Sequence, residues 1–412
     1  MTTQLWRTIT ANALWKALQL GSLFLLNIAI ARVFRAAGSG DFLFLVANFQ
    51  LAAFVASLSL ESGIQYFGTG DNGLLGAFSR FIFRYAAAAT LVLIALLVAV
   101  LSTHVLRPAI DPLLFGIYAV GFICGTLLFR FFSVLAYAVR AFVLPAAAET
   151  ACNLLLIILL ALHPSLPVFF ACFYLAPLVC GLIVYTWLRR RHPFVPGRGI
   201  DFPALVRYAG LSFLANLVFF GVYRVDYWFV AAGCNATELG NYIQASKLAQ
   251  LFIYLPQVIA MVVFPDVVQG MADRKTVVKL MAYTVGLFAL GVGIVALAGN
   301  RGLVWLLGST YDLVYPAWLR LVPGIFALGP LAILAAYFAA RNRVSVNLYG
   351  GLVGLAVMLA GDILFIPRYH IMGAAWVSSA SYAAYVLYEW VAFRTSRTAP
   401  IANASSASPT RS

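Results

Sequence analysis

Long apolar runs, separated by short polar breaks, follow one another along almost the whole chain. Each run holds about 20 residues or more, which is enough for a helix to cross the ~30 Å hydrocarbon core of a bilayer. A transmembrane β-barrel would instead show alternating segments of about ten residues. The pattern therefore predicts an all-α polytopic membrane protein. Its twelve expected spans are residues 8–34, 41–67, 79–103, 112–138, 143–163, 166–188, 204–231, 241–265, 277–298, 312–339, 345–366 and 371–393.

The longest polar stretch before the C-terminal end divides these spans into two groups of six. We therefore expect an N-terminal lobe over residues 1–190, a cytoplasmic linker over 191–203 and a C-terminal lobe over 204–394. Residues 395–412 are rich in Ser, Ala, Thr and Pro and have no apolar period, which predicts a disordered cytoplasmic tail.

Composition and charge sharpen this interpretation. Hydrophobic types make up 63% of the 412 residues and charged types only 10%, too few for a soluble globule of this length. The net charge of +14 does not indicate nucleic-acid binding, because the basic residues are scattered rather than clustered. With the N-terminus inside, 17 Lys and Arg fall at inner loops and 5 at outer loops, which predicts that both termini are cytoplasmic.

A repeat is visible when the sequence is shifted by 200 residues. The shift aligns Gly40 with Gly240 and Gln50 with Gln250. Polar side chains also gather on one face of the first, second, seventh and eighth spans, at ~100° per residue. These stripes predict a polar cavity shared by two lobes that are related by a parallel repeat. The alternative is hydrogen bonding between packed helices, which buried Asn, Gln and Ser also provide.

Five basic residues fall inside spans, where charge is expensive and therefore a functional candidate. Lys16 and Lys247 are the strongest, because each lies on a polar stripe, one in each lobe. Arg224 lies about 160° from the stripe of its own helix, so it either pairs with a neighbouring helix or reaches the interface. The full set expected to line a substrate cavity is Lys16, Lys247, Arg320, Arg224, Arg130, Asn12, Gln19, Asn216, Gln250 and Tyr254.

Three carboxylates are candidates for ion coupling: Asp226, Asp362 and Glu61. Asp226 lies on a stripe, and a fixed salt bridge with Lys247 or another basic residue is its alternative role. Asp362 is interpreted first as structural, paired with Arg368, and second as an ion-coupling group. The His and Cys residues show no metal-ligand spacing, so we expect no metal, no cofactor and no catalytic residue.

The stretch from Asn12 to Phe42 has a first helix dotted with polar residues, a Gly-containing turn and the start of a second helix, and Leu239 to Tyr242 repeats that turn. This order of features resembles bacterial polysaccharide flippases of the multidrug/oligosaccharidyl-lipid/polysaccharide exporter superfamily. The segment DILFIPRYHIMGAAWVSSASY, Asp362 to Tyr382, resembles the family's Asn, then Ile-Pro, then Gly-Ala-Ala. Two positions depart from the pattern: Asp362 stands where the family commonly has Asn, and His370 where it commonly has Gly.

The resemblance implies a MATE-like fold and the flipping of undecaprenyl-pyrophosphate-linked oligosaccharide units for surface polysaccharides such as lipopolysaccharide and exopolysaccharide. It implies a functional monomer in the bacterial cytoplasmic membrane, with a lipid-linked oligosaccharide and membrane lipids as partners. A polysaccharide polymerase or export machinery is a further candidate partner. One rival is a drug or organic-cation antiporter of the same fold, whose cavity would be dominated by carboxylates and aromatic residues. Another is a membrane-embedded polysaccharide-assembly enzyme, which would carry a sizeable extramembrane loop.

Overall fold

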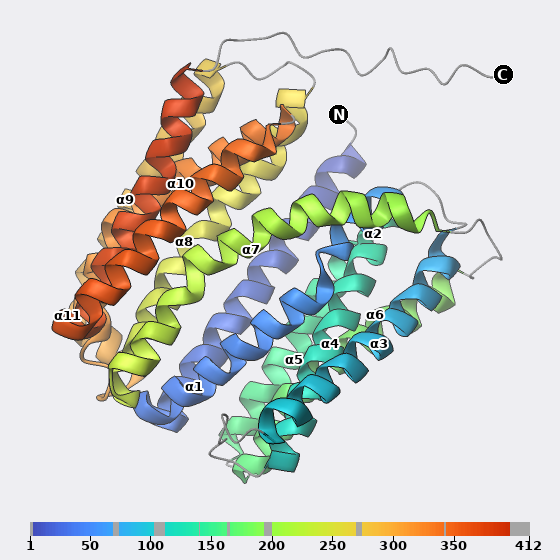
Figure 1. Cartoon of the computed structure of the whole chain (residues 1–412), viewed down its shortest axis with the longest axis horizontal. Coiled ribbons are helices and arrows are strands. Elements are labelled where there is room, and N and C mark those ends of the chain that lie inside the picture. Colours follow the sequence, from blue (N-terminus) through green and yellow to red (C-terminus); the bar gives the residue numbers. More distant parts are fainter. Residues whose placement is uncertain are drawn as a thin grey trace. The chain divides into compact units, whose positions relative to one another are not determined.

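The computed structural model describes residues 3–68, 74–102, 112–139, 141–162, 165–192, 200–268, 274–341 and 343–395. This part of the chain is almost entirely helical and contains no strand (Figure 1). In chain order the helices are α1 (Thr3–Ser57), α2 (Leu60–Gly68), α3 (Leu75–Ser102), α4 (Pro112–Ala138), α5 (Val143–Ala161), α6 (Leu166–Arg191), α7 (Phe202–Gly233), α8 (Ala236–Val268), α9 (Arg274–Leu307), α10 (Val314–Ala340) and α11 (Val344–Thr395).

The predicted spans fall on helices, with one interruption. The span expected over 41–67 is divided between the end of α1 and α2, because Leu58 (φ 48°) and Ser59 (φ 50°) break the helix there. Helices α1 and α11 also continue from one predicted span into the next across a residue with positive φ, Arg35 (φ 56°) in α1 and His370 (φ 51°) in α11. Within the described residues, nine helices are long and apolar enough to cross a membrane. The predicted all-α membrane fold is therefore confirmed.

The chain forms two compact units. One contains the residues up to Arg35 together with Phe42–Leu214, and the other contains Ala36–Asp41 together with the described residues from Ala215 onward. We call them unit 1 and unit 2. The division falls inside α7, so the first part of this helix packs in unit 1 and its second part in unit 2.

In unit 1, α4 packs against α2, α3 and α6. Phe78, Leu127 and Phe131 are fully buried members of this core. Helices α4 and α6 approach each other closely at Gly125, where an added Cβ would lie 2.4 Å from the backbone nitrogen of Leu178. The Gly121-x-x-x-Gly125 pattern therefore serves close helix packing, as small residues at this spacing commonly do in membranes.

In unit 2, α10 packs against α8, α9 and α11. Trp318 and Tyr337 of α10 are almost fully buried there. The repeat-related glycines Gly40 and Gly240 meet in the same unit, since a Cβ on Gly40 would lie 2.7 Å from the backbone nitrogen of Gly240. The shift of 200 residues thus aligns two positions at which backbones touch.

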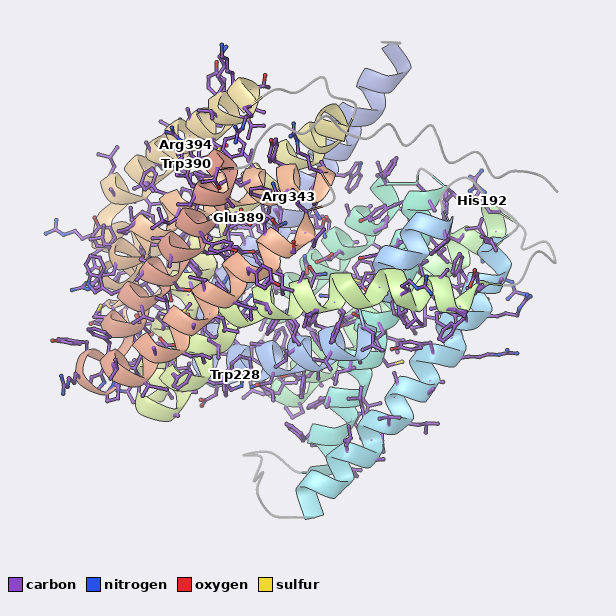
Figure 2. The ribbon with its side chains drawn as sticks, turned by 45° about the horizontal axis from the view of Figure 1, so that its top comes forward. His192, Trp228, Arg343, Glu389, Trp390 and Arg394 are labelled. Atoms are coloured by element: carbon purple, nitrogen blue, oxygen red, sulfur yellow. The ribbon has the colours of Figure 1, made fainter. Side chains whose placement is uncertain are left out.

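Aromatic and basic side chains gather near the C-terminal end of α11. The Arg394 guanidinium lies 4.9 Å from the centre of the Trp390 ring, and Trp390 stacks on Phe393. Figure 2 shows Trp390 and Arg394 close together at this end of the helix. Arg274, at the start of α9, lies over the other partner ring, 4.8 Å from the centre of Phe393. Aromatic rings and arginines of this kind are typical of the membrane–water interface.

Candidate functional site

A basic cluster joins α7 to α8 in unit 2. Arg224 donates a hydrogen bond from Nη2 to Oε1 of Gln250, at 3.1 Å, and another from Nη1 to the hydroxyl of Tyr227, at 2.6 Å. Gln250 in turn donates to Ser246, at 3.2 Å. Lys247 lies close enough to Arg224 for their charges to interact. We call Arg224, Lys247, Gln250, Tyr227 and Ser246 the basic cluster; it contains three of the predicted cavity residues.

Arg224 therefore contacts a neighbouring helix, one of the two roles that the sequence left open for it. Its two hydrogen-bond partners are neutral side chains. Arg224 and Lys247 are both half-buried within their helices. Asp226 is also close enough to Arg224 for their charges to interact. A guanidinium forms strong charge-assisted bonds to phosphate oxygens, so two neighbouring cations are suited to an anionic group.

A second site in unit 2 is formed by two buried carboxylates, Asp226 of α7 and Asp362 of α11. Asp226 is 1% exposed and accepts hydrogen bonds from the hydroxyls of Tyr242 and of Ser378, the latter at 3.1 Å. Asp362 is 0% exposed and close enough to Asp226 for their charges to interact. Neither oxygen of Asp362 has a hydrogen-bond partner within the described residues. We call Asp226 and Asp362 the carboxylate pair.

The contacts of the carboxylate pair bear on two interpretations made from sequence. Asp226 accepts hydrogen bonds from the hydroxyls of Tyr242 and Ser378, and it is close enough to the basic residue Arg224 for their charges to interact. Asp362 does not pair with Arg368, because the Asp362 side chain is buried with both oxygens unpartnered whereas Arg368 is exposed. A buried carboxylate without partners is unstable as an anion, so it is expected to take up a proton or a cation.

In unit 1, polar side chains of α1 and α5 form a connected chain. The ammonium of Lys16 donates to Oε1 of Gln19, at 2.9 Å, and Gln19 donates to the carboxylate of Glu149. One turn further along, Asn153 donates to the hydroxyl of Ser22, at 3.1 Å. Lys16 is exposed, so its charge remains open to solvent or to a ligand.

Arg130 and Arg320, two further basic residues inside predicted spans, each contact a neighbouring group. Arg130 forms an ion pair with Glu61, with 3.7 Å between Nη1 and Oε1. Arg320 donates to the backbone oxygen of Pro316 on its own helix, at 2.8 Å. The structure therefore joins Arg130, a cavity candidate, to Glu61, an ion-coupling candidate, while Arg320 lies along α10.

The remaining predicted cavity residues are dispersed or not described. Asn216 is exposed on α7, and Tyr254 is half-buried on α8. The side chain of Asn12 lies outside the described residues.

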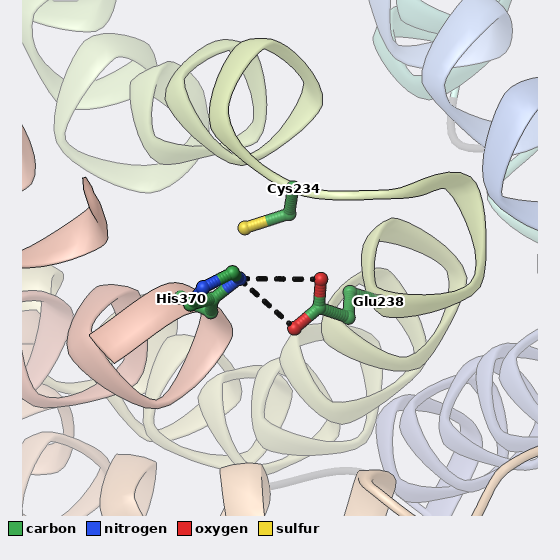
Figure 3. A group of neighbouring side chains, drawn as sticks. All are labelled: Cys234, Glu238 and His370. Carbon is green, nitrogen blue, oxygen red and sulfur yellow. Dashed lines mark hydrogen bonds and ion pairs between the residues drawn. The ribbon is translucent and has the colours of Figure 1, made fainter. Parts of the chain in front are cut away.

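Sequence reasoning missed two features. Glu389 of α11 is 0% exposed, and neither of its oxygens has a hydrogen-bond partner among the described residues. In the sequence, Glu389 is recognisable only as a single acidic residue inside an apolar run. Cys234, Glu238 and His370 also meet in unit 2, with their ligand-type atoms all within 4.8 Å of one another (Figure 3). Cys234 and Glu238 are four residues apart, but His370 lies 132 residues beyond Glu238, so no local motif joins all three.

The chain resembles known proteins in part of its sequence and in its fold. A family profile described as polysaccharide biosynthesis protein matches residues 147–311. No curated protein matches the chain at a significant level. A solved structure of the lipid II flippase MurJ in an inward closed conformation resembles the chain with a TM-score of 0.71. Its sequence identity is 14%, over 94% of this chain and 87% of that chain.

Two other solved structures have the same fold. The Vibrio cholerae MATE transporter VcmN in a bent form is 14% identical, with a TM-score of 0.63 over 95% of this chain and 97% of that chain. A MOP superfamily transporter from Pyrococcus furiosus, described as having a binding pocket of reverse polarity, is 12% identical. Its TM-score is 0.63 over 94% of each chain. The predicted resemblance is confirmed: this chain has the fold of the MurJ and MATE transporter structures, and residues 147–311 match a polysaccharide biosynthesis family.

Proposed function

We propose that the chain flips undecaprenyl-pyrophosphate-linked oligosaccharide repeat units from the inner to the outer leaflet of the bacterial cytoplasmic membrane. Two six-helix lobes, residues 1–190 and 204–394, would give alternating access to a polar, cationic cavity. The cargo crosses without a covalent change, so no catalytic residue is proposed. Both termini are cytoplasmic in this proposal, and the protein acts as a monomer.

The basic cluster is the observation that carries the proposal. The polar head of the cargo is a pyrophosphate dianion, and a charge can enter a membrane interior only when it is paired. Arg224 and Lys247 lie close together, and the hydrogen bonds of Arg224 go to neutral side chains. We assign Arg224 and Lys247 to pyrophosphate binding in unit 2, and Lys16, which is exposed and bonded to Gln19, to the same role in unit 1.

The other cavity candidates receive lesser roles. Amide and hydroxyl side chains suit sugar hydroxyls, which need both donors and acceptors. We propose this role for Asn12, Gln19, Asn216, Gln250 and Tyr254. Arg130 and Arg320 would act near the ends of the path, since each already has a partner in its own unit.

The carboxylate pair supports coupling to an ion gradient. Asp226 and Asp362 are buried neighbours, and the oxygens of Asp362 lack partners among the described residues. A proton or a sodium ion would neutralise this charge, and its release would restore it. Glu61, the third candidate, faces Arg130 and would couple only when that ion pair opens.

The decisive experiment measures lipid-linked repeat units in the outer leaflet after the gene is deleted. In a strain without a paralogue, externalisation should stop and be restored by the wild-type gene. The charge-reversed variant Lys16→Glu/Lys247→Glu should insert normally and fail to restore it. Lys279→Glu is the matched control, because Lys279 is exposed near the start of α9. Unchanged externalisation in the deletion strain would contradict the proposal.

A drug antiporter is the main rival, and the carboxylate pair is the observation in its favour, since buried acids attract cations. The rival predicts that loss of Asp226 or Asp362 raises sensitivity to cationic drugs while surface polysaccharide is unchanged. A membrane-embedded enzyme is the other rival, and it predicts that the lipid-linked unit leaves the reaction covalently altered.

A further inference from the structure

Three metal-ligand side chains meet at one end of unit 2, outside the sites proposed for cargo and for coupling. Cys234 follows the last residue of α7, Glu238 lies in the first turn of α8, and His370 lies at the break in α11. Their ligand-type atoms all lie within 4.8 Å of one another (Figure 3). Nδ1 of His370 is 3.3 Å from Oε1 and 3.4 Å from Oε2 of Glu238.

The separation between the imidazole and the carboxylate suits a tetrahedral ion, and the Cys234 sulfur lies within 4.8 Å of both. Ligands bound at about 2.0–2.3 Å with tetrahedral angles lie roughly 3.3–3.6 Å apart. The distances from His370 to Glu238 are within this range, at 3.3 and 3.4 Å. Figure 3 shows the sulfur of Cys234 directed toward the same space as the imidazole and the carboxylate.

Helix capping explains only part of this arrangement. Asn235 and Glu238 form a reciprocal cap at the start of α8: Glu238 N donates to Oδ1 of Asn235 at 2.9 Å, and the backbone N of Asn235 donates to Oε2 of Glu238 at 3.3 Å. This pairing is the capping-box arrangement, and Nδ2 of Asn235 donates to the same Oε2 at 2.9 Å. It leaves Oε1 of Glu238 facing His370, and it involves neither the imidazole nor the thiol.

The backbone of His370 is a second observation. Its φ of 51° is a conformation that glycine adopts freely and that other residues rarely adopt. The chain nevertheless carries an imidazole here, with the ring toward Glu238. The side chain is 54% exposed, so an ion in solution can reach it.

We propose that Cys234, Glu238 and His370 form a binding site for a zinc ion, with water in the fourth position. One sulfur, one nitrogen and one oxygen ligand are a set that Zn²⁺ accepts and that Mg²⁺ and Ca²⁺ do not favour. The bound ion would tie the turn between α7 and α8 to the break in α11.

The test uses the full-length protein in detergent, stripped of metal with a chelator and titrated with Zn²⁺ by calorimetry. One ion should bind per chain. Co²⁺ should replace it and give the absorption of a tetrahedral site with a thiolate ligand. The variants Cys234→Ser, Glu238→Gln and His370→Gly should each weaken Zn²⁺ binding by about tenfold or more.

Each variant is chosen to preserve the fold. Glutamine also serves in a capping box, glycine suits the positive φ at residue 370, and serine has nearly the size of cysteine. The controls are Cys172→Ser, which removes an exposed thiol of unit 1, and His192→Gln, which removes an imidazole of unit 1. The controls should bind like the wild type. Binding that survives all three site variants, or a Co²⁺ spectrum without a thiolate band, would overturn the proposal.

Discussion

The guanidinium of Arg224 on α7 donates a hydrogen bond to the side-chain oxygen of Gln250 on α8, across 3.1 Å. The second donor group of Arg224 goes to Tyr227, also a neutral side chain. These two hydrogen bonds fix the position of the guanidinium, and Asp226 is close enough for its charge to interact with Arg224. An anionic headgroup would therefore have to compete with Asp226 for Arg224.

Replacing Arg224 tests this role directly. Arg224→Gln should lower export of lipid-linked repeat units by about tenfold or more, because a charge-assisted bond contributes ~1.5–3 kcal/mol and 1.4 kcal/mol is a factor of ten. Arg224→Lys should retain part of the activity, because it keeps the charge but loses the planar fork. Export is measured as surface polysaccharide at matched protein level, with the exposed Arg343→Gln as control. Normal export by Arg224→Gln would remove the basic cluster from the mechanism.

Replacing the two members of the carboxylate pair should have different effects on thermal stability. Asp362 is fully buried without hydrogen-bond partners in the described part of the chain, so Asp362→Leu should raise the thermal midpoint in detergent. An unpaired buried polar group costs ~1–3 kcal/mol. The same variant should lose transport driven by an ion gradient. Asp226→Leu should instead lower the midpoint, since it strands the hydroxyls of Tyr242 and Ser378. Equal destabilisation by both variants would argue against this assignment.

The fold was predictable because hydropathy alone identifies spans of ~20 apolar residues. The breaks at Arg35 and His370 fall between predicted spans, although neither residue type favours a positive φ. The contacts within the candidate site were harder to predict from the sequence. A helical period gives the side of a helix on which a residue lies, and it does not give the neighbouring helix. Arg224 was therefore placed off the stripe, and its contact with Gln250 could not be foreseen.

Contacts between residues far apart in the sequence could not be predicted either. Asp362 has Arg368 six residues away in the sequence, yet helix geometry buries the acid and exposes the base. Its neighbour is Asp226, on a helix far earlier in the chain. In the sequence His370 was notable only as a departure from glycine. Its contact with Cys234 and Glu238 depends on how the end of α7, the start of α8 and the break in α11 come together.

The ion pair between Arg130 and Glu61 should contribute little to stability. The two side chains are 39% and 21% exposed, and the charged atoms are 3.7 Å apart. Partly exposed pairs contribute ~0–1 kcal/mol. A double-mutant cycle with Arg130→Gln and Glu61→Gln, read by unfolding in detergent, should therefore give a coupling energy below about 1 kcal/mol. A larger coupling would mean that the pair is shielded from solvent and takes part in holding α2 to α4.

Close packing at Gly240 should tolerate no side chain. An added Cβ would lie 1.9 Å from the backbone oxygen of Ala36, which belongs to the same unit and cannot rotate away. Overpacking of this kind typically costs ~1–3 kcal/mol. Gly240→Ala should therefore lower the unfolding midpoint of the purified protein. Gly286→Ala is the matched control, because this helical glycine has no atom within 4 Å of the added Cβ, and alanine there should be neutral or stabilising by up to ~1 kcal/mol. If both variants unfold at the wild-type temperature, the backbone contact between Gly240 and Ala36 does not exist in the folded protein.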